Sequence, residues 1–543
     1  MKKIIGAAIG SCVHVAGLHH FLRLAEMEGY RTITFGPAVP VERLVRLIRD
    51  EKPDITALSY RLTPEAAAEL FADLGSELKK AELEKTRMIF GGTAPVAERA
   101  VKSGLFEKVF NGTESVESIR QYLRGTNIRA AKGSLSDTLI GRIEQKYPYP
   151  LLRHHFGRPT MAETLEGVIK ISEAGVLDVL SIGPDQNAQE HFFHPDDMDP
   201  TQDGAGGVPL RKAEDLEAIY NSTRCGNYPL VRCYAGTRDL MKWAEMSVRT
   251  INNAWGAIPL CWYNVIDGRS KRPMEEAIRE NQEVMHWYAL KGIPVEVNES
   301  HQWSLRDAHD SLAVAMAFLA AYNAKKAGVR HYVSQYMFNN PPGTSAEMDI
   351  AKMLAKDEMI RELDDDSFTI FRQVRAGLAH LSADPSIAKG QLAASAVISL
   401  ALKPHILHVV GFSEGDHAIF PDELIQSCNI IHGVLHNTLY GLPDMTGNTI
   451  VRERKEELKN EARILLEELR RRGKDKSDDP WSDAAVIAEA IKTGLFDTPH
   501  FQGNPHLCGT ITTNLIDGAW YAIDRNTGRR LTEEERIKKL KGI

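Results

Sequence analysis

Four short segments near the amino terminus combine residue types that can hold a ligand. They contain, in chain order, His14 with Gly17, Ser59 with Arg61, Gly91-Gly92-Thr93, and Gly112-Thr113. A neutral imidazole is a common metal ligand, and a glycine lets a bulky ligand approach the backbone closely. Small and hydroxyl residues at such positions leave backbone N–H groups accessible. The pattern therefore predicts a slot for a flat ligand rich in heteroatoms.

A parallel sheet would bring these segments together. Over residues 1–125, apolar runs of strand length alternate with helical segments, and each candidate segment follows one of those runs. Such alternation predicts right-handed βαβ crossovers and a doubly wound sheet, in which ligands bind at the carboxyl ends of the strands. The patterns GxGxxG and GxxxxGK[ST] are absent from the sequence, which disfavours a dinucleotide or P-loop site.

The rest of the chain divides into three further segments. Residues 126–160 lose the alternation and contain several prolines, which predicts a linker. Residues 161–445 resume it, and seven or eight strand–helix units predict a (β/α)8 TIM barrel, with a second doubly wound sheet as the alternative. Residues 446–543 predict a charged helix followed by a small C-terminal module.

Length and composition restrict the class of protein. A chain of 543 residues predicts two or three domains. The net charge of −7 offers no basic surface for nucleic acid or an anionic membrane, and no apolar run reaches the ~18 residues of a membrane span. We therefore expect a cytoplasmic protein without nucleic-acid or membrane partners. A small-molecule substrate and a homodimer are separate expectations.

In order and spacing, the four segments resemble the cobalamin-binding domain of cobalamin-dependent mutases and methionine synthase. That domain carries DxHxxG, SxL, GG and a late G-T on a flavodoxin-like sheet. The resemblance implies that His14 ligates cobalt in place of the cofactor's dimethylbenzimidazole, and that Ser59 meets the buried base. The implied cofactor site comprises Ser11, Cys12, His14, Gly17, Ser59, Arg61, Gly91, Gly92, Thr93, Gly112 and Thr113. An ordinary sheet with incidental glycines is the alternative.

Two positions depart from that pattern. Cys12 stands where the family has the aspartate that holds the ligating imidazole, and Arg61 stands where it has leucine. A carboxylate partner fixes the imidazole tautomer and raises its basicity. A thiol in its place predicts weaker or more labile cobalt coordination.

The second part of the chain is similar to the large subunit of glutamate mutase through most of residues 195–540. Stretches that carry the similarity include GAIPLCWYN, GVRHYVSQY and IFRQVRAGLAHLSAD. The similarity implies a barrel that seals substrate against the cobalt face. It places Gly206 and Asn264 near the cofactor and Tyr336 at the substrate.

The substrate arginines of glutamate mutase match poorly. Bidentate guanidinium–carboxylate pairs suit a dicarboxylate, but Gly204 and Glu299 occupy two of the arginine positions and only Arg232 stands in for one. Glu299 would attract an amine or a hydroxyl group. The implied catalytic set is Arg232, Glu299, Tyr336 and His417, and the substrate is expected to differ from glutamate.

Two other clusters stay open on the sequence alone. The segment EHFFHPDDMD could form a mixed nitrogen and oxygen metal site or a solvated loop. Arg375 and His380 would lie at the carboxyl end of a barrel strand, where barrel active sites form.

The resemblance implies an adenosylcobalamin-dependent radical isomerase, a carbon-skeleton mutase that works by homolysis of the cobalt–carbon bond. Few acid–base residues are then needed, since the cofactor carries the hard step. A non-isomerase corrinoid enzyme or methyl carrier is the alternative, and Cys12 favours it. A cobalamin-responsive regulatory protein is a third class, which would not need the barrel.

Overall fold

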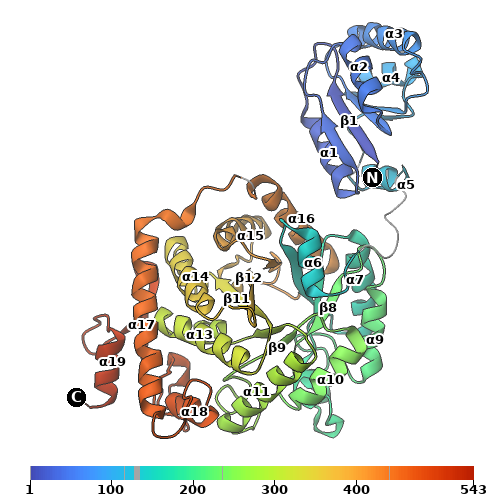
Figure 1. The fold of residues 1–543 in the computed structure, drawn as a ribbon. Coiled ribbons are helices and arrows are strands. Elements are labelled where there is room, and N and C mark those ends of the chain that lie inside the picture. Colours follow the sequence, from blue (N-terminus) through green and yellow to red (C-terminus); the bar gives the residue numbers. More distant parts are fainter. Residues whose placement is uncertain (1, 115, 127–134, 235, 440, 543) are drawn as a thin grey trace. The chain divides into compact units, whose positions relative to one another are not determined.

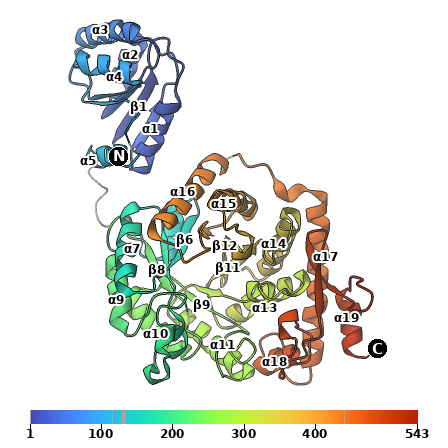
Figure 2. The same ribbon diagram turned by 180° about the vertical axis from the view of Figure 1, so that it is seen from behind.

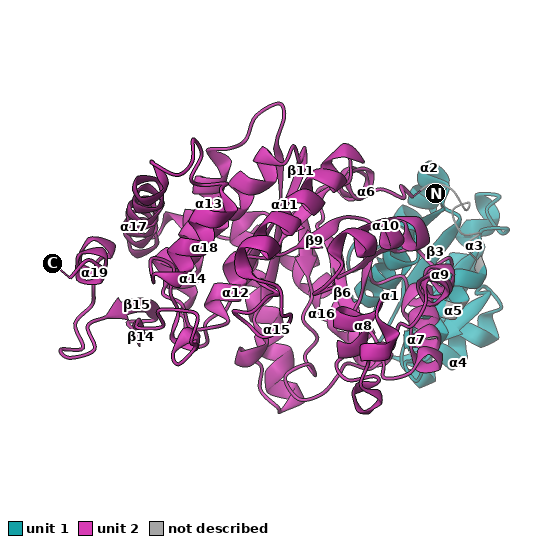
Figure 3. Cartoon of the chain, turned by 90° about the horizontal axis from the view of Figure 1, so that it is seen from below, with its two compact units in different colours: residues 1–134 teal, residues 135–543 magenta. Residues whose placement is uncertain are grey.

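A computed structural model describes residues 2–114, 116–126, 135–234, 236–439 and 441–542. The chain forms two compact units, Met1–Ser134 and Leu135–Ile543 (Figure 3). Each unit contains its own parallel sheet.

The first unit is a five-stranded parallel sheet in the order β2-β1-β3-β4-β5. This 2-1-3-4-5 order is that of flavodoxin-like folds, as the sequence predicts. Its elements are β1 (Lys3–Ala8), α1 (Ala16–Met27), β2 (Arg31–Thr34), α2 (Val41–Glu51), β3 (Ile55–Ser59), α3 (Pro64–Lys80), β4 (Met88–Gly91), α4 (Ala94–Ser103), β5 (Lys108–Phe110) and α5 (Val116–Thr126).

Helices cover both faces of this sheet (Figure 1). Leu18 and Phe21 of α1 pack with Leu123 of α5 against Ile4 and Ile89 on one face. The helices α2, α3 and α4 supply the core of the opposite face, which includes three mutually packed rings, Phe71, Phe90 and Phe106. Apolar side chains at helical spacing thus bury both faces and leave the strand ends to form loops.

The second unit is built on an eight-stranded parallel sheet that curls into a nearly closed barrel (Figure 2). The order is β8-β7-β6-β13-β12-β11-β10-β9. Between β8 and β9 no ladder is present in the described part of the chain, but the Ala254 N–H donates to the Val231 carbonyl at 2.9 Å. The strands are β6 (Leu151–Phe156), β7 (Val179–Ile182), β8 (Leu230–Cys233), β9 (Gly256–Ile258), β10 (Val295–Val297), β11 (His331–Phe338), β12 (Thr369–Ala376) and β13 (Ile406–His408).

The segment predicted as a linker, residues 126–160, differs from that expectation. It contains α6 (Leu139–Lys146) and β6, which pairs with both β13 and β7. Leu139 and Ile143 of α6 pack against Leu151 and other apolar side chains at one end of the barrel. Prolines on either side of β6 hide a strand that the barrel needs, and residues 127–134 lie outside the described residues.

Helices surround the barrel and bury its outer face (Figures 1 and 2). They are α7 (Met161–Ala174), α8 (Gln186–His191), α9 (Ala213–Ser222), α10 (Leu240–Ile251), α11 (Met274–Leu290), α12 (Ser300–Ser304), α13 (Asp310–Lys326), α14 (Ala346–Arg361), α15 (Pro385–Ser399) and α16 (Pro421–Thr438). The stretch Pro385–Leu402, which includes α15, is long and apolar enough to cross a membrane by composition. In the structure α15 lies against α16 and β12 as one of the barrel helices.

The carboxyl-terminal segment packs on the barrel helices. It comprises α17 (Thr449–Gly473), α18 (Ala484–Lys492), the hairpin β14 (Thr512–Ile516) and β15 (Ala519–Ile523), and α19 (Glu533–Leu540). Leu458 and Leu465 of α17 join the core formed with α13 and α14. The predicted charged helix is therefore a packed element of the second unit.

Candidate functional site

A cavity of about 490 Å³ opens at the carboxyl edge of the first unit's sheet, on the face covered by α1 and α5. Most of its walls are apolar side chains from the sheet and these helices. Of the predicted cofactor residues, the cavity is lined by His14, Gly17, Ser59, Arg61, Gly91, Gly92, Thr93 and Gly112. The sheet thus brings together residues nearly a hundred positions apart in the sequence.

Inside the cavity, Ser59 provides a polar group without a partner. Its Oγ is buried and forms no hydrogen bond, which is unusual because buried hydroxyls are nearly always paired. A Cβ added at Gly17, Gly91 or Gly112 would meet open space, so these positions keep the cavity wide. A buried hydroxyl in an apolar pocket fits the heterocyclic base of a cobalamin tail.

Gly92 has a different role. A Cβ there would lie 2.8 Å from the Tyr60 carbonyl oxygen and 2.8 Å from the Phe90 ring. The glycine is therefore required by close packing of the strand ends.

His14 lies exposed at the rim of this cavity, before the start of α1. Its Nδ1 is 3.8 Å from the Sγ of buried Cys12, a weak contact compared with a carboxylate hydrogen bond. The structure thus leaves the imidazole accessible, as a cobalt ligand must be. The weaker coordination expected from Cys12 stays a prediction.

The loop after β5 differs from the predicted slot. The backbone N–H groups of Asn111 and Gly112 donate to the Glu114 carboxylate at 3.1 and 3.0 Å. Although burial alone would raise the pKa of Glu114, these backbone bonds hold it below its usual range. The exposed Thr113 hydroxyl donates to Asn111, and neither it, Ser11 nor Cys12 lines the cavity.

In the second unit, a buried polar network fills the barrel interior above its apolar end. Arg153 of β6 donates to Ser181 Oγ, Gln373 Oε1 and His155 Nε2, each at 2.7 Å. Gln373 in turn donates to Gln335 at 3.0 Å. Every one of these side chains comes from a barrel strand, so the sheet fixes their positions.

Arg232 lies in the same interior and has no exposed surface. Its Nη2 is 3.9 Å from Glu296 Oε2, and its Nε and Nη2 form no hydrogen bond. Glu296 also accepts from the Trp255 indole N–H at 2.6 Å. Although burial opposes ionisation, the two arginines Arg153 and Arg232 hold the pKa of Glu296 below its usual range.

Three histidines of the barrel are held in the neutral form. Burial lowers the pKa of His155, His301 and His408 well below its usual range, and Arg153 and Arg375 add to the effect at all three. His155 stacks on Tyr234 with ring centroids 4.6 Å apart and lies 4.7 Å from the His408 ring. These histidines therefore add no positive charge to the interior, and the arginines around them do.

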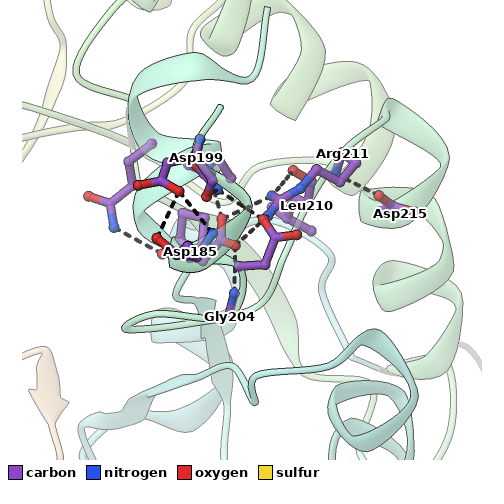
Figure 4. Close-up of polar contacts among 12 residues, drawn as sticks. Asp185, Asp199, Gly204, Leu210, Arg211 and Asp215 are labelled. Atoms are coloured by element: carbon purple, nitrogen blue, oxygen red, sulfur yellow. Dashed lines mark hydrogen bonds and ion pairs between the residues drawn. The ribbon is translucent and has the colours of Figure 1, made fainter. Parts of the chain in front are cut away.

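The loop after β7, which carries Gly206, is fixed by a buried carboxylate (Figure 4). Asp185 accepts from the Gly204 N–H at 2.9 Å and forms an ion pair with Arg211 at 2.6 Å. Gly206 has φ +78°, and a Cβ there would meet open space. Its predicted closeness to the cofactor stays a prediction.

Asn264 holds its own loop. Its side chain donates to the Cys261 carbonyl at 2.8 Å and accepts from the Ile266 N–H at 3.1 Å, and the residue has no exposed surface. These local bonds explain an asparagine there without a cofactor contact.

Three predicted catalytic residues lie apart from the barrel interior network. Glu299 accepts from the backbone N–H groups of Leu260 and Cys261 at 3.0 and 2.9 Å and from the Trp303 indole at 2.7 Å. Its carboxylate therefore anchors a loop. This structural role explains why glutamate stands at the position where glutamate mutase has arginine.

Tyr336 points outward from the barrel. Its hydroxyl donates to Asp357 of α14 at 2.8 Å, and its ring packs in the core between sheet and helices. Side chains alternate along a strand, so its neighbour Gln335 faces the interior instead. The predicted substrate contact of Tyr336 does not agree with this orientation.

His417 lies exposed on the loop after β13. Its two ring nitrogens are engaged by Asp416 at 2.8 Å and Glu423 at 3.1 Å. These carboxylates raise the pKa of His417 above its usual range.

The sequence prediction overlooked Arg153, His155, Tyr234, Glu296 and His408. A signal was present, because polar residues recur at every second position of otherwise apolar strands, as in LLRHHF and LVRCY. In a buried parallel strand, that spacing puts them all on one face.

The open metal hypothesis gains no support. In the part of the chain that the structure describes, no group of three or more His, Cys, Asp or Glu residues is placed to hold a metal ion. His194 is paired with Asp239 at 2.8 Å, and Asp197 with Arg238 at 3.1 Å.

Comparison with known proteins places the first unit in a family. Residues 2–119 match the family described as "B12 binding domain". No curated protein matches the sequence significantly.

Three solved structures resemble parts of the chain. A novel cobalamin-binding protein from Desulfitobacterium hafniense DCB-2 is 24% identical, with 23% of this chain and 58% of that one covered (TM-score 0.20). The cobalamin-dependent S-adenosylmethionine radical enzyme OxsB is 10% identical, with 91% and 66% covered (TM-score 0.18). NtrX from Brucella abortus is 12% identical, with 90% and 99% covered (TM-score 0.18).

At TM-scores this low, the likenesses establish neither a shared overall fold nor a shared activity. The chain also spans less than two thirds of the length of the first two proteins. The family match and the cavity geometry concern the same residues, and together they identify the first unit of this chain as a B12-binding domain.

Proposed function

We propose that the chain is a cobalamin-dependent radical isomerase, with adenosylcobalamin as cofactor and a substrate other than glutamate. The observation that carries the cofactor assignment is the cavity, which has an accessible His14 at its rim and the unpartnered Ser59 hydroxyl inside. When bound, adenosylcobalamin supplies a carbon radical by homolysis of its cobalt–carbon bond.

The protein's own residues would bind, orient and exclude water. In the first unit, His14 would ligate cobalt and Ser59 would contact the base of the nucleotide tail. Gly17, Gly91 and Gly112 leave room for that tail, and Arg61 at the cavity wall provides a cation for its phosphodiester.

The barrel supports the isomerase assignment through what its interior contains. Its polar groups include arginines, neutral histidines and amides, and most of their side chains are buried. Exclusion of water protects a reactive intermediate from side reactions. Such an interior suits a reaction that needs binding and shielding more than proton transfer.

Anaerobic addition of adenosylcobalamin and candidate substrates tests the reaction. We expect an electron paramagnetic resonance signal from a radical coupled to cobalt with the true substrate and none without it. Silence with every candidate, together with methyl uptake from a methyl donor, would exclude the isomerase.

Replacing His14 tests the axial role separately. His14→Ala should shift the visible spectrum of bound cobalamin toward the form without a nitrogen ligand, because the substitution removes the proposed ligating imidazole. His20, which also lines the cavity, belongs to α1 and not to that loop. His19→Ala is the matched control, since His19 follows in α1 and does not line the cavity. An unchanged spectrum in His14→Ala would refute histidine ligation.

A non-isomerase corrinoid enzyme or methyl carrier is a second candidate, favoured by Cys12. The 3.8 Å thiol contact leaves the imidazole less firmly held than a carboxylate would. A methyl carrier would need its lower cobalt ligand to leave and return, and a loosely held His14 would allow this more readily. The methyl-uptake arm above distinguishes the two functions.

A further inference from the structure

Arg375 lies at the carboxyl end of the barrel strand β12. The residue is half-buried, and its only described side-chain hydrogen bond runs from Nε to the Ala376 carbonyl at 3.2 Å. No carboxylate among the described residues lies within ion-pair distance of it. Buried or half-buried arginines are normally paired.

The interior network near Arg375 contains more hydrogen-bond donors than acceptors. Arg153 is an obligate donor to His155 Nε2, so the neutral imidazole carries its proton on Nδ1. That Nδ1 is buried without a partner, as are Nε and Nη2 of Arg232. The acceptors Ser181, Gln373 and Gln335 are already used within the network.

The charges of the barrel interior, like its unpaired donors, favour an anionic ligand. Three arginines, 153, 232 and 375, surround one interior carboxylate, Glu296. Glu414 is a second carboxylate that attracts Arg375, and it also accepts from the Gly411 N–H at 2.6 Å. Three guanidinium groups therefore face two carboxylates. In a low-dielectric interior, an uncompensated positive charge favours an anion strongly.

We propose that the barrel interior binds an oxyanionic group, a carboxylate or a phosphate, through the guanidinium of Arg375. The positive charges of Arg153 and Arg232 add electrostatic attraction for the anion. The two N–H groups of the Arg375 guanidinium give the contact its direction. The inference rests on the proposed function only in assigning substrate binding to the barrel. The substrate of the barrel would then carry a carboxylate or phosphate group. Its direct contact would be Arg375, which is outside the predicted catalytic set.

Thermal-shift titrations of the full chain without cobalamin test the site. The probes are sodium acetate and inorganic phosphate, with chloride balancing ionic strength. We expect a saturable rise in Tm with at least one probe. The concentration for half the effect should increase at least tenfold in Arg375→Gln, because a charged hydrogen bond is lost. Response to acetate alone identifies a carboxylate site, and response to phosphate alone a phosphate site.

Arg372→Gln is the matched control, because Arg372 lies on the same strand and donates to the Lys403 carbonyl at 3.0 Å instead. It should titrate like the unaltered protein, while Arg375→Lys, which keeps the charge and loses the fork, should be intermediate. Equal titration of Arg375→Gln and the unaltered protein, or no response to either anion, would overturn the proposal. Cobalamin binding by Arg375→Gln is read from the visible spectrum, so failure here is distinct from failure of the cofactor assignment.

Discussion

Gly91→Leu is expected to weaken cobalamin binding by about ten- to a hundredfold. Gly91 ends β4 and lines the cavity, and a Cβ there enters open space. The leucine side chain would occupy volume that the nucleotide tail needs, and overpacking of this kind costs ~1–3 kcal/mol. The dissociation constant is measured by spectral titration with cobalamin.

The same reasoning selects its control. Gly433 in α16 is exposed and also has open space beyond its Cβ, but it belongs to the other unit. Gly433→Leu should leave the dissociation constant unchanged. If Gly91→Leu also binds normally, the tail does not enter this cavity, and the assignment of His14 as cobalt ligand in place of the cofactor's own base fails with it.

Asp310→Asn is expected to destabilise the second unit by about 3–5 kcal/mol, the usual cost of removing one partner from a buried ion pair. Asp310 begins α13 and is 1% exposed. It pairs with Lys352 of α14 and Arg454 of α17, both at 3.1 Å, and accepts from the Trp520 N–H at 3.2 Å. Its loss leaves two buried cations without that partner.

Urea unfolding at neutral pH measures this effect. Asp365→Asn is the control, since Asp365 is half exposed in its ion pair with Lys325, and exposed pairs contribute little. Although burial opposes ionisation, Lys352 and Arg454 hold the pKa of Asp310 below its usual range. The stabilisation is therefore present above the ordinary carboxyl pKa and is lost as pH falls through the folded-state value. If both variants lose the same free energy of unfolding, the buried ion pairs of Asp310 contribute no more than an exposed pair.

The sequence predicted that residues far apart in the first unit would meet at one sheet edge, and most of them line one cavity. Ser59 and Gly91 end their strands, and His14 and Gly112 lie in the loops after β1 and β5. Parallel strands bring their carboxyl ends to one edge. Local order was therefore sufficient to place them together. The prediction that backbone N–H groups are free to bind a ligand fails in the loop after β5. There the N–H groups of Asn111 and Gly112 donate to the Glu114 carboxylate.

The second unit shows the limit of such reasoning. The alternation of strands and helices predicted a barrel, but β6 was hidden between prolines and its Arg153 and His155 were overlooked. Orientation was the other difficulty. Glu299 and Tyr336 were assigned by position along the chain, whereas the fold directs one to a loop and the other to α14.

The sequence by itself determined a doubly wound sheet with a B12-type pattern at its strand ends, and a second parallel α/β unit. Both follow from local properties, namely the periodicity of apolar residues and the residue types next to strand ends. Only the tertiary structure decided which polar side chains share the barrel interior and which donors there lack acceptors. Those depend on contacts between strands as far apart as Arg153 and Gln373, and a side chain's partner in space is set by the closure of the whole sheet.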